Sequence, residues 1–401
     1  MTDAPLGIGV IGLGRAFSLM VPTFARDARV KIVAGFDLRE EPRRRLASDF
    51  GAATYDQAEA LCSNPDVDVV YVASPHQFHA EHVQMAARHG KHVLAEKPMA
   101  LTLAECDAMI RACDEARVHL LVGHCHSFDT PYLQTRALID SGRFGVPRMI
   151  HAFNYTDFLY RPRRPEELRT EEGGGVVYSQ AAHQIDVLRL LAGGRLVRVR
   201  AMTAAWDDSR PTEGAYSAML WFDNGCVATA VYSGYAHYDS DEWGGWTGEM
   251  GQPKDPGRHA GARTRLAQVG TPGEEAALKA ATTYGGPSWR DARMEAGPIG
   301  HQHFGAVIVS CERADLRPLP DGVWIDADTH REKLELPAPA IPRAEVIDEL
   351  HAAVRFGTLP LHSGRWARDT LAGCLAMIDS ARRNVDVQLE PYARIDGLSQ
   401  A

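Results

Sequence analysis

The stretch Gly7-Ile8-Gly9-Val10-Ile11-Gly12-Leu13-Gly14-Arg15-Ala16-Phe17 decides the fold of the first part of the chain. Its apolar residues predict a buried strand, and a helical pattern begins directly after Gly14. Gly12 permits a sharp turn, and Gly14 lets the main chain approach a pyrophosphate that the helix N-terminus stabilises. Phe17, beside Ala16, stands where a third small residue is expected. The turn predicts a dinucleotide site, although a tight strand-to-helix turn alone also explains the glycines.

Apolar, β-branched runs alternate with helix-period segments as far as residue 121. This alternation is typical of a parallel sheet covered on both faces, so residues 1–125 are predicted to form a doubly wound Rossmann domain. Thr102 and Glu105 have the spacing of a capping box that opens a helix. Pro22 predicts a kink or a restart in the first helix.

Residues 126–401 have the pattern of a second, α+β domain with a mixed, largely antiparallel open sheet. A helix at about 131–141 bridges the two domains, and helices at about 343–356 and 366–383 close the chain. The segment 237–301 is a long excursion, rich in Gly, Pro and charge, with one helical stretch near 274–281. Loops of this length are usually lids, interface arms or disordered segments.

Asp37 ends the second strand run, where a carboxylate accepts hydrogen bonds from the adenosine ribose hydroxyls. The same carboxylate would repel a 2′-phosphate, which favours NAD. Arg39 follows closely and could instead receive that phosphate, so NADP is the alternative.

Composition excludes several classes of function. The 401 residues carry 43 Lys plus Arg against 52 Asp plus Glu, a net charge of −9. Because the basic residues are scattered, neither nucleic acid nor a membrane is an expected partner. Seven cysteines without a Cys-x-x-Cys pair indicate reduced thiols. With no targeting or spanning segment in the pattern, we expect a cytoplasmic protein.

Three motifs carry a resemblance to a known family. They are the run 74–79, the run 90–98 that contains Glu96-Lys97-Pro98, and the triple glycine 173–175 with the polar residues that follow it. Their order resembles the Gfo/Idh/MocA oxidoreductases. A closer likeness, through 12–17, 179–184 and 309–317, is to the subgroup of phthalate 4,5-dihydrodiol or 4,5-dihydroxyphthalate dehydrogenases. The resemblance implies hydride transfer from a hydroxyl carbon to a nicotinamide, and a homodimer or homotetramer formed through the C-terminal sheet.

By that resemblance Lys97 matches the catalytic lysine and His183 the catalytic histidine. Ser179 stands where the family usually has an aspartate, so proton relay or substrate orientation at this catalytic position must differ. The residues expected at the cofactor are Gly12, Gly14, Arg15, Ala16, Phe17, Asp37, Arg39, Ser74, Pro75, His79, Glu96 and Lys97.

A helix over 177–191 would place Ser179, His183 and Asp186 on one face. His183 is the natural general base, since its ordinary pKa near 6.5 allows proton exchange around neutrality. Lys97 would stabilise alkoxide character on the reacting oxygen, and Asp186 would orient His183 or a backbone amide. The assignment depends on Lys97 and His183 converging on one nicotinamide face.

An aromatic diacid would need cations and aromatic walls. The residues predicted to contact the substrate are Arg161, Arg163, Arg164, Tyr155, Tyr178, His124 and His303. A solvated basic loop and core packing are the alternatives for these residues. The His124/His126 and His301/His303 pairs also permit a metal, but no acidic or thiol partner stands nearby at motif spacing, so no metal is expected.

The sequence thus predicts an NAD(P)-dependent dehydrogenase acting on a hydroxyl or cis-diol of a small cyclic, anionic substrate, with a phthalate-type dihydrodiol favoured. The alternatives are a sugar or polyol dehydrogenase of the inositol type, an NAD-dependent glycosidase, and a non-catalytic NAD(P)-sensing regulator.

Overall fold

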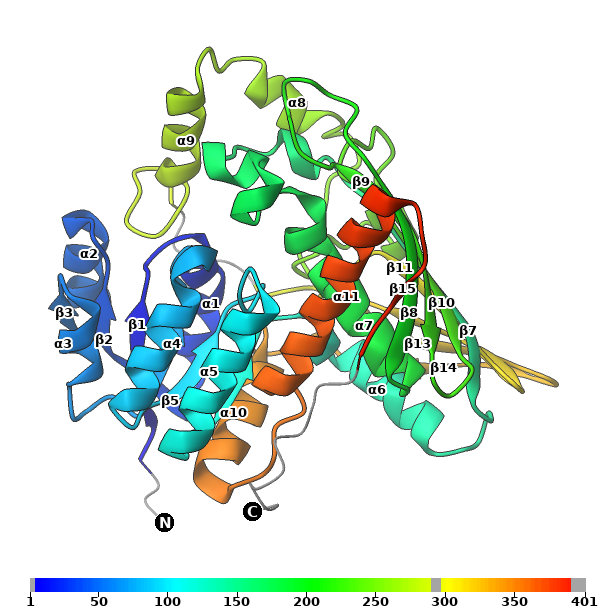
Figure 1. The fold of residues 1–401 in the computed structure, drawn as a ribbon, viewed down its shortest axis with the longest axis horizontal. Helices are drawn as coiled ribbons and strands as arrows, with labels where there is room; N and C mark the ends of the chain where they lie inside the picture. The colour runs from blue at the N-terminus through cyan, green and yellow to red at the C-terminus, as the bar shows by residue number, and fades with distance from the viewer. Residues whose placement is uncertain (1–3, 290–296, 391–401) are drawn as a thin grey trace.

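The first of two sheets (Figure 1) is parallel throughout, with strand order β3-β2-β1-β4-β5-β6 in the computed structural model, which describes residues 4–289 and 297–390. Its strands are β1 (Leu6–Ile11), β2 (Val30–Phe36), β3 (Ala53–Tyr55), β4 (Val69–Val72), β5 (His92–Ala95) and β6 (Leu120–Val122). The predicted Rossmann sheet is confirmed. Because all its strands run the same way, the turns after β1, β4 and β5 meet at one edge of the sheet.

Helices cover both faces of this sheet. They are α1 (Arg15–Arg26), α2 (Glu40–Phe50), α3 (Ala58–Cys62), α4 (His79–Arg88) and α5 (Leu103–Ala116). The capping box of α5 is confirmed: the Glu105 amide donates to Thr102 Oγ1 at 3.2 Å, and the Thr102 amide donates to Glu105 Oε2 at 2.9 Å. The predicted restart at Pro22 is wrong, since α1 continues through it. The buried face of α1, which includes Phe17 and Met20, offsets the lost hydrogen bond.

The second sheet has the order β14-β13-β12-β11-β7-β10-β9-β8-β15. Among the described strands of this sheet only β7 and β10 pair in parallel, so the predicted mixed, largely antiparallel sheet is confirmed. Its strands are β7 (Pro147–Tyr155), β8 (Leu196–Ala204), β9 (Ala215–Phe222), β10 (Val227–Ser233), β11 (Ala306–Cys311), β12 (Ala314–Leu319), β13 (Gly322–Ala327), β14 (Arg331–Glu335) and β15 (Val387–Gln388).

Three helices, α6 (Thr130–Asp140), α7 (Ala182–Ala192) and α11 (Gly364–Arg383), pack on one face of this sheet. The other face is open: Met149, Met202 and Met219 are 41%, 57% and 45% exposed. The helix α10 (Ala344–Phe356) returns to the first domain, where Val346, Ile347 and Leu350 join the same apolar cluster as β1 and β4. The N-terminal core therefore includes a helix that the division at residue 125 assigned to the second domain.

Short helical turns shape the connections. They are η1 (His76–Phe78), η2 (His126–Phe128), η3 (Phe158–Tyr160), η4 (Pro165–Leu168), η5 (Thr170–Glu172), the π-helical η6 (Val177–Ala181) and η7 (Ser240–Gly244). The π turn of η6 replaces the first part of the α-helix predicted over 177–191. Because a π turn advances by an extra residue, Ser179 and His183 do not have the α-helical spacing expected of them.

The excursion 237–301 forms more structure than predicted, with η7, α8 (Gly261–Leu266) and α9 (Pro272–Ala281). Figure 1 shows α8 near the second sheet and α9 above the first domain. Beyond α9, the Tyr284 amide donates to Ser18 Oγ at 2.8 Å. The Tyr284 and Phe17 rings pack edge-on, with 4.9 Å between their centroids. The excursion thus joins the second domain to α1.

Within the two described ranges, no helix is both long and apolar enough to cross a membrane. All seven cysteines are free thiols.

Candidate active site

Lys97 is the second residue after β5, with a cis peptide bond to Pro98. Its Nζ donates a hydrogen bond to the main-chain oxygen of Ser179 at 3.1 Å. The end of a Rossmann strand therefore meets the π turn that precedes α7. Burial lowers the pKa of Lys97, although the neighbouring Glu96 carboxylate acts in the opposite direction.

His183 stands in the first turn of α7 and is 6% exposed. Its Nδ1 is buried and has no hydrogen-bond partner among the described residues. Burial, and next the Lys97 charge, hold the pKa of His183 well below its ordinary value. Lys97 thus contacts the turn four residues before His183, and its charge favours the neutral form of that imidazole.

A second histidine, which sequence reasoning left out of the site, faces His183. The rings of His126 and His183 meet edge-on at 4.7 Å. His126 Nδ1 lies 2.6 Å from Asp129 Oδ2, and its Nε2 lies 3.6 Å from Glu249 Oε1. Burial alone would lower the pKa of His126, but the two carboxylates raise it overall. Adjacent imidazoles are therefore pushed toward opposite protonation states, a pattern typical of acid–base sites.

Glu249 reaches this point from the excursion, and no sequence signal predicted it. Burial would raise its pKa, but the contact with His126 and the charge of Arg161 lower it to about 2. Arg161 Nη1 lies 3.9 Å from Glu249 Oε2, and Arg161 Nε lies 3.2 Å from Asp157 Oδ1. The excursion thus contributes a charged group to the site as well as bridging the domains.

Arg15, Arg161 and Arg343 surround the site with positive charge. Arg15 is exposed at the start of α1 and has no hydrogen bond or ion pair within residues 4–289 and 297–390. Partial desolvation by the surrounding protein, and then the charges of Arg161 and Arg343, lower the pKa of Arg15. Three mutually repelling guanidiniums near Glu249, of which only Arg161 also pairs with Asp157, are suited to an anionic ligand.

The turn after β1 fits a dinucleotide. Gly12 has φ +96°, and a Cβ there would lie 2.7 Å from Ala73 O, so only glycine fits. A Cβ at Gly14 would meet nothing within 4 Å, which leaves the N-terminus of α1 open to a phosphate. Asp37 Oδ2 accepts from the Leu13 amide at 2.9 Å, and Oδ1 accepts from Arg39 Nε at 3.0 Å. These bonds fix the carboxylate at the predicted ribose position, with Arg39 beside it.

Residues 6–124 match a family described as "Oxidoreductase family, NAD-binding Rossmann fold", and 132–252 match the "GFO/IDH/MocA C-terminal domain". The chain belongs to the Gfo/Idh/MocA oxidoreductase family. It is an NAD-dependent dehydrogenase, as the resemblance implied.

Individual relatives agree with this assignment. The oxidoreductase is 48% identical, over 94% of both chains, to 1-carboxy-3-chloro-3,4-dihydroxycyclohexa-1,5-diene dehydrogenase of Comamonas testosteroni. It is 30% identical to myo-inositol 2-dehydrogenase of Thermotoga maritima, over 48% of this chain and 57% of that protein. A crystal structure of a protein assigned as a dehydrogenase from Bordetella bronchiseptica RB50 matches with TM-score 0.89 and 41% identity, covering 96% of this chain and all of that one.

Two residues predicted at the cofactor of the oxidoreductase have other roles. His79 is fully buried, and its ring nitrogens lie 2.9 Å from Ser74 O and 3.1 Å from Pro98 O, so it ties the turn after β4 to the Lys97 segment. The Phe17 side chain is also fully buried and packs on Tyr284 rather than facing a cofactor.

The other predicted cofactor residues lie on the same edge of the sheet. Ser74 Oγ is 2.9 Å from His82 Nδ1, and Glu96 Oε1 accepts from Tyr71 OH at 2.5 Å. Ala16 and Pro75 are half-buried beside the glycine turn and at the start of η1.

Strand alternation corrects the prediction for Tyr155. It shares a face of β7 with Met149 and Phe153, the open face of the sheet, whereas Ile150 and Ala152 face the helices. Tyr178 is not a substrate wall either. It is buried in the Rossmann-side cluster, and its OH donates to Leu101 O at 3.3 Å.

The predicted arginine fork is only partly correct, because Arg161 alone of the three reaches the site. The Arg163 guanidinium lies 3.6 Å from the Phe158 ring centroid, and the Arg163 amide donates to Glu275 of α9. Arg164 pairs with Glu166 at 3.0 Å. Arg163 therefore fastens its loop to the excursion, whereas Arg164 pairs with a residue of its own loop.

His303 is a structural residue of the excursion in this enzyme. Its Nε2 lies 2.8 Å from Thr247 O, and its Nδ1 accepts from the Gly305 amide at 3.2 Å. Both ring nitrogens are therefore occupied by main-chain groups, which contradicts the substrate role predicted for it.

The two polar neighbours of His183 also differ from expectation. Ser179 offers Lys97 its main-chain oxygen, while its hydroxyl donates to Gly175 O. Asp186 accepts from Trp366 Nε1 at 2.7 Å and from Thr370 Oγ1 at 2.5 Å, so it anchors α11 and does not orient His183.

His124 has the acidic partner that the sequence interpretation missed. Its Nε2 lies 2.8 Å from Asp129 Oδ1, and burial lowers its pKa to about 3. The potential ligand atoms of His124, His126 and Asp129 lie within 4.8 Å of one another. The three form a hydrogen-bonded triad in which Asp129 holds both rings beside His183.

Proposed function

We propose that the protein oxidises one hydroxyl of a cyclic cis-dihydrodiol that bears a carboxylate, using NAD⁺. The observation that carries this proposal is that Lys97 contacts the turn before His183 and acts on its charge state. Arg15, Arg161 and Arg343 add positive charge around these two residues. The name of the Comamonas relative supports it, because a carboxylated dihydroxycyclohexadiene is both cyclic and anionic.

The electrostatics favour an anion over a neutral sugar. The site combines Lys97, Arg15, Arg161 and Arg343, whereas its carboxylates already have partners: Asp129 and Glu249 contact His126, Asp157 pairs with Arg161, and Glu96 accepts from Tyr71. The position where the family's polyol dehydrogenases usually have an aspartate is Ser179, whose hydroxyl is bonded within its own turn. A carboxylated ring therefore fits the charge of the site better than inositol does.

The chain's own residues divide the chemistry between them. Nδ1 of the neutral His183 is available to accept the substrate hydroxyl proton. The Lys97 ammonium stabilises the negative charge that develops on the same oxygen. The turn at Gly12–Gly14 and the Asp37 carboxylate hold the dinucleotide, whose nicotinamide takes up the hydride when it is bound. The remaining ketone can enolise to a catechol, which makes the oxidation of a dihydrodiol strongly favourable.

Steady-state assays with NAD⁺ test the proposal. We expect NADH to form in proportion to a carboxylated cis-dihydrodiol, and myo-inositol and glucose to be oxidised far more slowly. Ready oxidation of inositol with no activity on any cis-dihydrodiol would contradict it. Substrate turnover without net NADH would indicate the glycosidase alternative, and unchanged biological activity in Lys97→Ala would indicate the regulator.

We also propose that the open face of the second sheet pairs with a second copy of the chain. Met202 and Met219 lie on the neighbouring strands β8 and β9 of this face, Met149 lies on β7 beyond β10, and each is at least two-fifths exposed. Covering such an apolar sheet face is the usual solution in soluble proteins. Light scattering should report a dimer or larger assembly, and Met219→Arg should dissociate it. A monomeric wild-type protein would refute this interface.

A further inference from the structure

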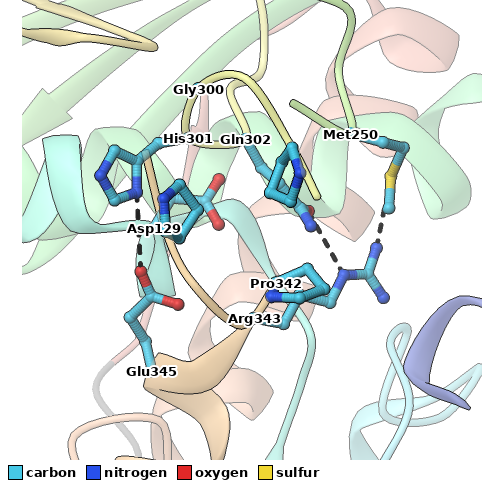
Figure 2. A pocket seen from close by; sticks show the side chains of 10 residues that line it. Asp129, Met250, Gly300, His301, Gln302, Pro342, Arg343 and Glu345 are labelled. Carbon is cyan, nitrogen blue, oxygen red and sulfur yellow. Dashed lines mark hydrogen bonds and ion pairs between the residues drawn. The ribbon is translucent and has the colours of Figure 1, made fainter. Parts of the chain in front are cut away.

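A narrow cavity adjoins the site where the η2 loop, the excursion and the start of α10 meet (Figure 2). Its lining includes Asp129, Met250, Gly300, Gln302, Arg343 and Glu345. The cavity has room for about one water-sized group, so it can receive a small polar group of a ligand but not a ring.

Arg343 is a buried cation without a carboxylate partner. The residue is 8% exposed and adopts φ +57°, a conformation that non-glycine residues rarely take. Its Nε donates to Gln302 Oε1 at 3.3 Å, and its Nη2 contacts Met250 Sδ at 3.5 Å. No carboxylate lies within 4.0 Å of the guanidinium in the part of the chain that the structure describes. A buried charge with only neutral partners is unfavourable unless a ligand compensates it.

Gln302 places a second unsatisfied donor at the same point. It is 6% exposed, and its Nε2 has no hydrogen-bond partner among the described residues, while its Oε1 orients Arg343. An amide donor beside a guanidinium is the arrangement that binds a carboxylate through more than one hydrogen bond.

The two acids that line the cavity are engaged elsewhere. Asp129 holds His124 and His126, and Glu345 accepts from the Thr130 amide and hydroxyl. Figure 2 shows the Arg343 guanidinium directed away from Glu345 and toward Met250. Neither acid therefore fills the anion-binding capacity of Arg343.

The Arg343 charge also acts on the reacting groups. After burial and the nearer charges, it contributes to the low pKa values of Lys97 and His183. Geometry links the cavity to the same groups: Asp129 lines it and holds His126, whose ring centroid lies 4.7 Å from that of His183. An anion bound to Arg343 would therefore lie near enough to His183 to belong to a substrate whose hydroxyl is there.

We propose that the Arg343 guanidinium and Gln302 Nε2 form the subsite that binds the carboxylate of the cyclic substrate. This rests on the proposed function and deepens it, since it assigns the substrate's charge to two residues of the chain. The substrate carboxylate and a phosphate of the cofactor are both oxyanions, and either would suit these two donors. The experiment therefore measures the binding of substrate and the binding of cofactor separately.

The test compares wild type, Arg343→Met and the exposed control Arg258→Met. Substrates are the cis-dihydrodiol of benzoate and the cis-dihydrodiol of benzene, which lacks the carboxylate. We expect Arg343→Met to raise KM for the carboxylated diol by about 10- to 100-fold, the usual worth of charged hydrogen bonds, and to leave KM for the other diol and the Kd of NADH unchanged. An unchanged KM for the carboxylated diol would overturn the proposal, as would a rise confined to the Kd of NADH, which would assign Arg343 to the cofactor phosphate.

A second variant and a binding assay keep the result interpretable. Gln302→Glu supplies Arg343 with an internal carboxylate, so it should weaken the binding of benzoate to the NADH complex by about 10-fold or more, as Arg343→Met should. Calorimetry measures this without turnover. If wild type binds benzoate but oxidises neither diol, the proposed function fails while the subsite stands. If wild type and both variants bind benzoate equally, or none binds it, the subsite is refuted.

Discussion

Lys97 Nζ donates its hydrogen bond to the main-chain oxygen of Ser179, not to the serine side chain. The π turn at Val177–Ala181 presents this oxygen, and the Ser179 hydroxyl is occupied by Gly175 O. Ser179, for which the resemblance to the family implies an aspartate, thus acts through its backbone. Any residue that preserves the turn can hold the lysine there.

We therefore expect Ser179→Ala to keep kcat within about threefold of wild type and to lower the free energy of unfolding by about 1 kcal/mol, the net value of one hydrogen bond. NADH production and urea unfolding measure the two effects. A loss of kcat approaching that of a catalytic-group deletion would show that the hydroxyl takes part in the reaction.

Replacing the lysine itself should be far more damaging. Lys97→Met should lower kcat by about 10²- to 10³-fold, because the developing alkoxide loses its nearest positive charge. Fluorescence titration should show NADH still bound. Lys31→Met, an exposed lysine on β2, is the control and should leave kcat unchanged. Equal effects in the two variants would rule out a specific role for Lys97.

The pH dependence follows from the low pKa of His183. A base must be neutral to accept a proton, so the acid limb of kcat/KM should lie below pH 6.5, and activity should be level from there to neutrality. Removing the Lys97 charge should move the pKa of His183 upward, which NMR titration of the histidine rings can detect even in the inactive Lys97→Met. A His183 pKa at or above 6.5 in wild type would contradict this.

Glu249 should stabilise the fold at neutral pH. Its folded-state pKa of about 2 lies below the ordinary value of 4.5, so its contribution is present above pH 4.5 and disappears as the pH falls toward 2. Glu249→Gln should cost about 1–3 kcal/mol at pH 7, and the difference from wild type should shrink by pH 3. Thermal unfolding at both pH values measures this. A difference independent of pH would mean that its ionisation is not involved.

Tyr284 anchors the excursion to the first domain. Its side chain is fully buried against Phe17, so Tyr284→Ala should lower the free energy of unfolding by about 3–5 kcal/mol. Tyr238→Ala, which removes a tyrosine that is 42% exposed, should cost much less. Equal losses would show that the excursion is not anchored through Tyr284.

Local sequence signals predicted much of the fold. The glycine turn after β1, the alternation of strands with helices and the Thr102–Glu105 cap depend on neighbours in the chain, and each is confirmed. The π turn before α7 was not predictable from periodicity, because its residues suit an α-helix equally well. The division at residue 125 placed α10 with the second domain, whereas it packs with β1 and β4, because its apolar face does not specify which sheet it covers.

The candidate site was likewise predicted where it depends on local motifs and missed where it depends on tertiary contacts. Lys97 and His183 stand in motifs and were predicted, whereas Glu249 and Arg343 come from an excursion and a helix start without a local signature. Tyr155 and Arg163 had suitable chemistry in the right neighbourhood, but strand alternation and contacts with α9 direct them elsewhere. Only the tertiary structure shows which charges converge.

The excursion has a practical consequence for handling this enzyme. Its exposed stretch at residues 255–259 looks like a tolerant site for a tag, a linker or a protease nick. Yet this stretch is the covalent path between Glu249 at the reacting groups and Tyr284 at the nucleotide helix. A single cut there would leave both ends docked but mechanically independent, so proteolysed preparations should not be treated as equivalent to the intact chain.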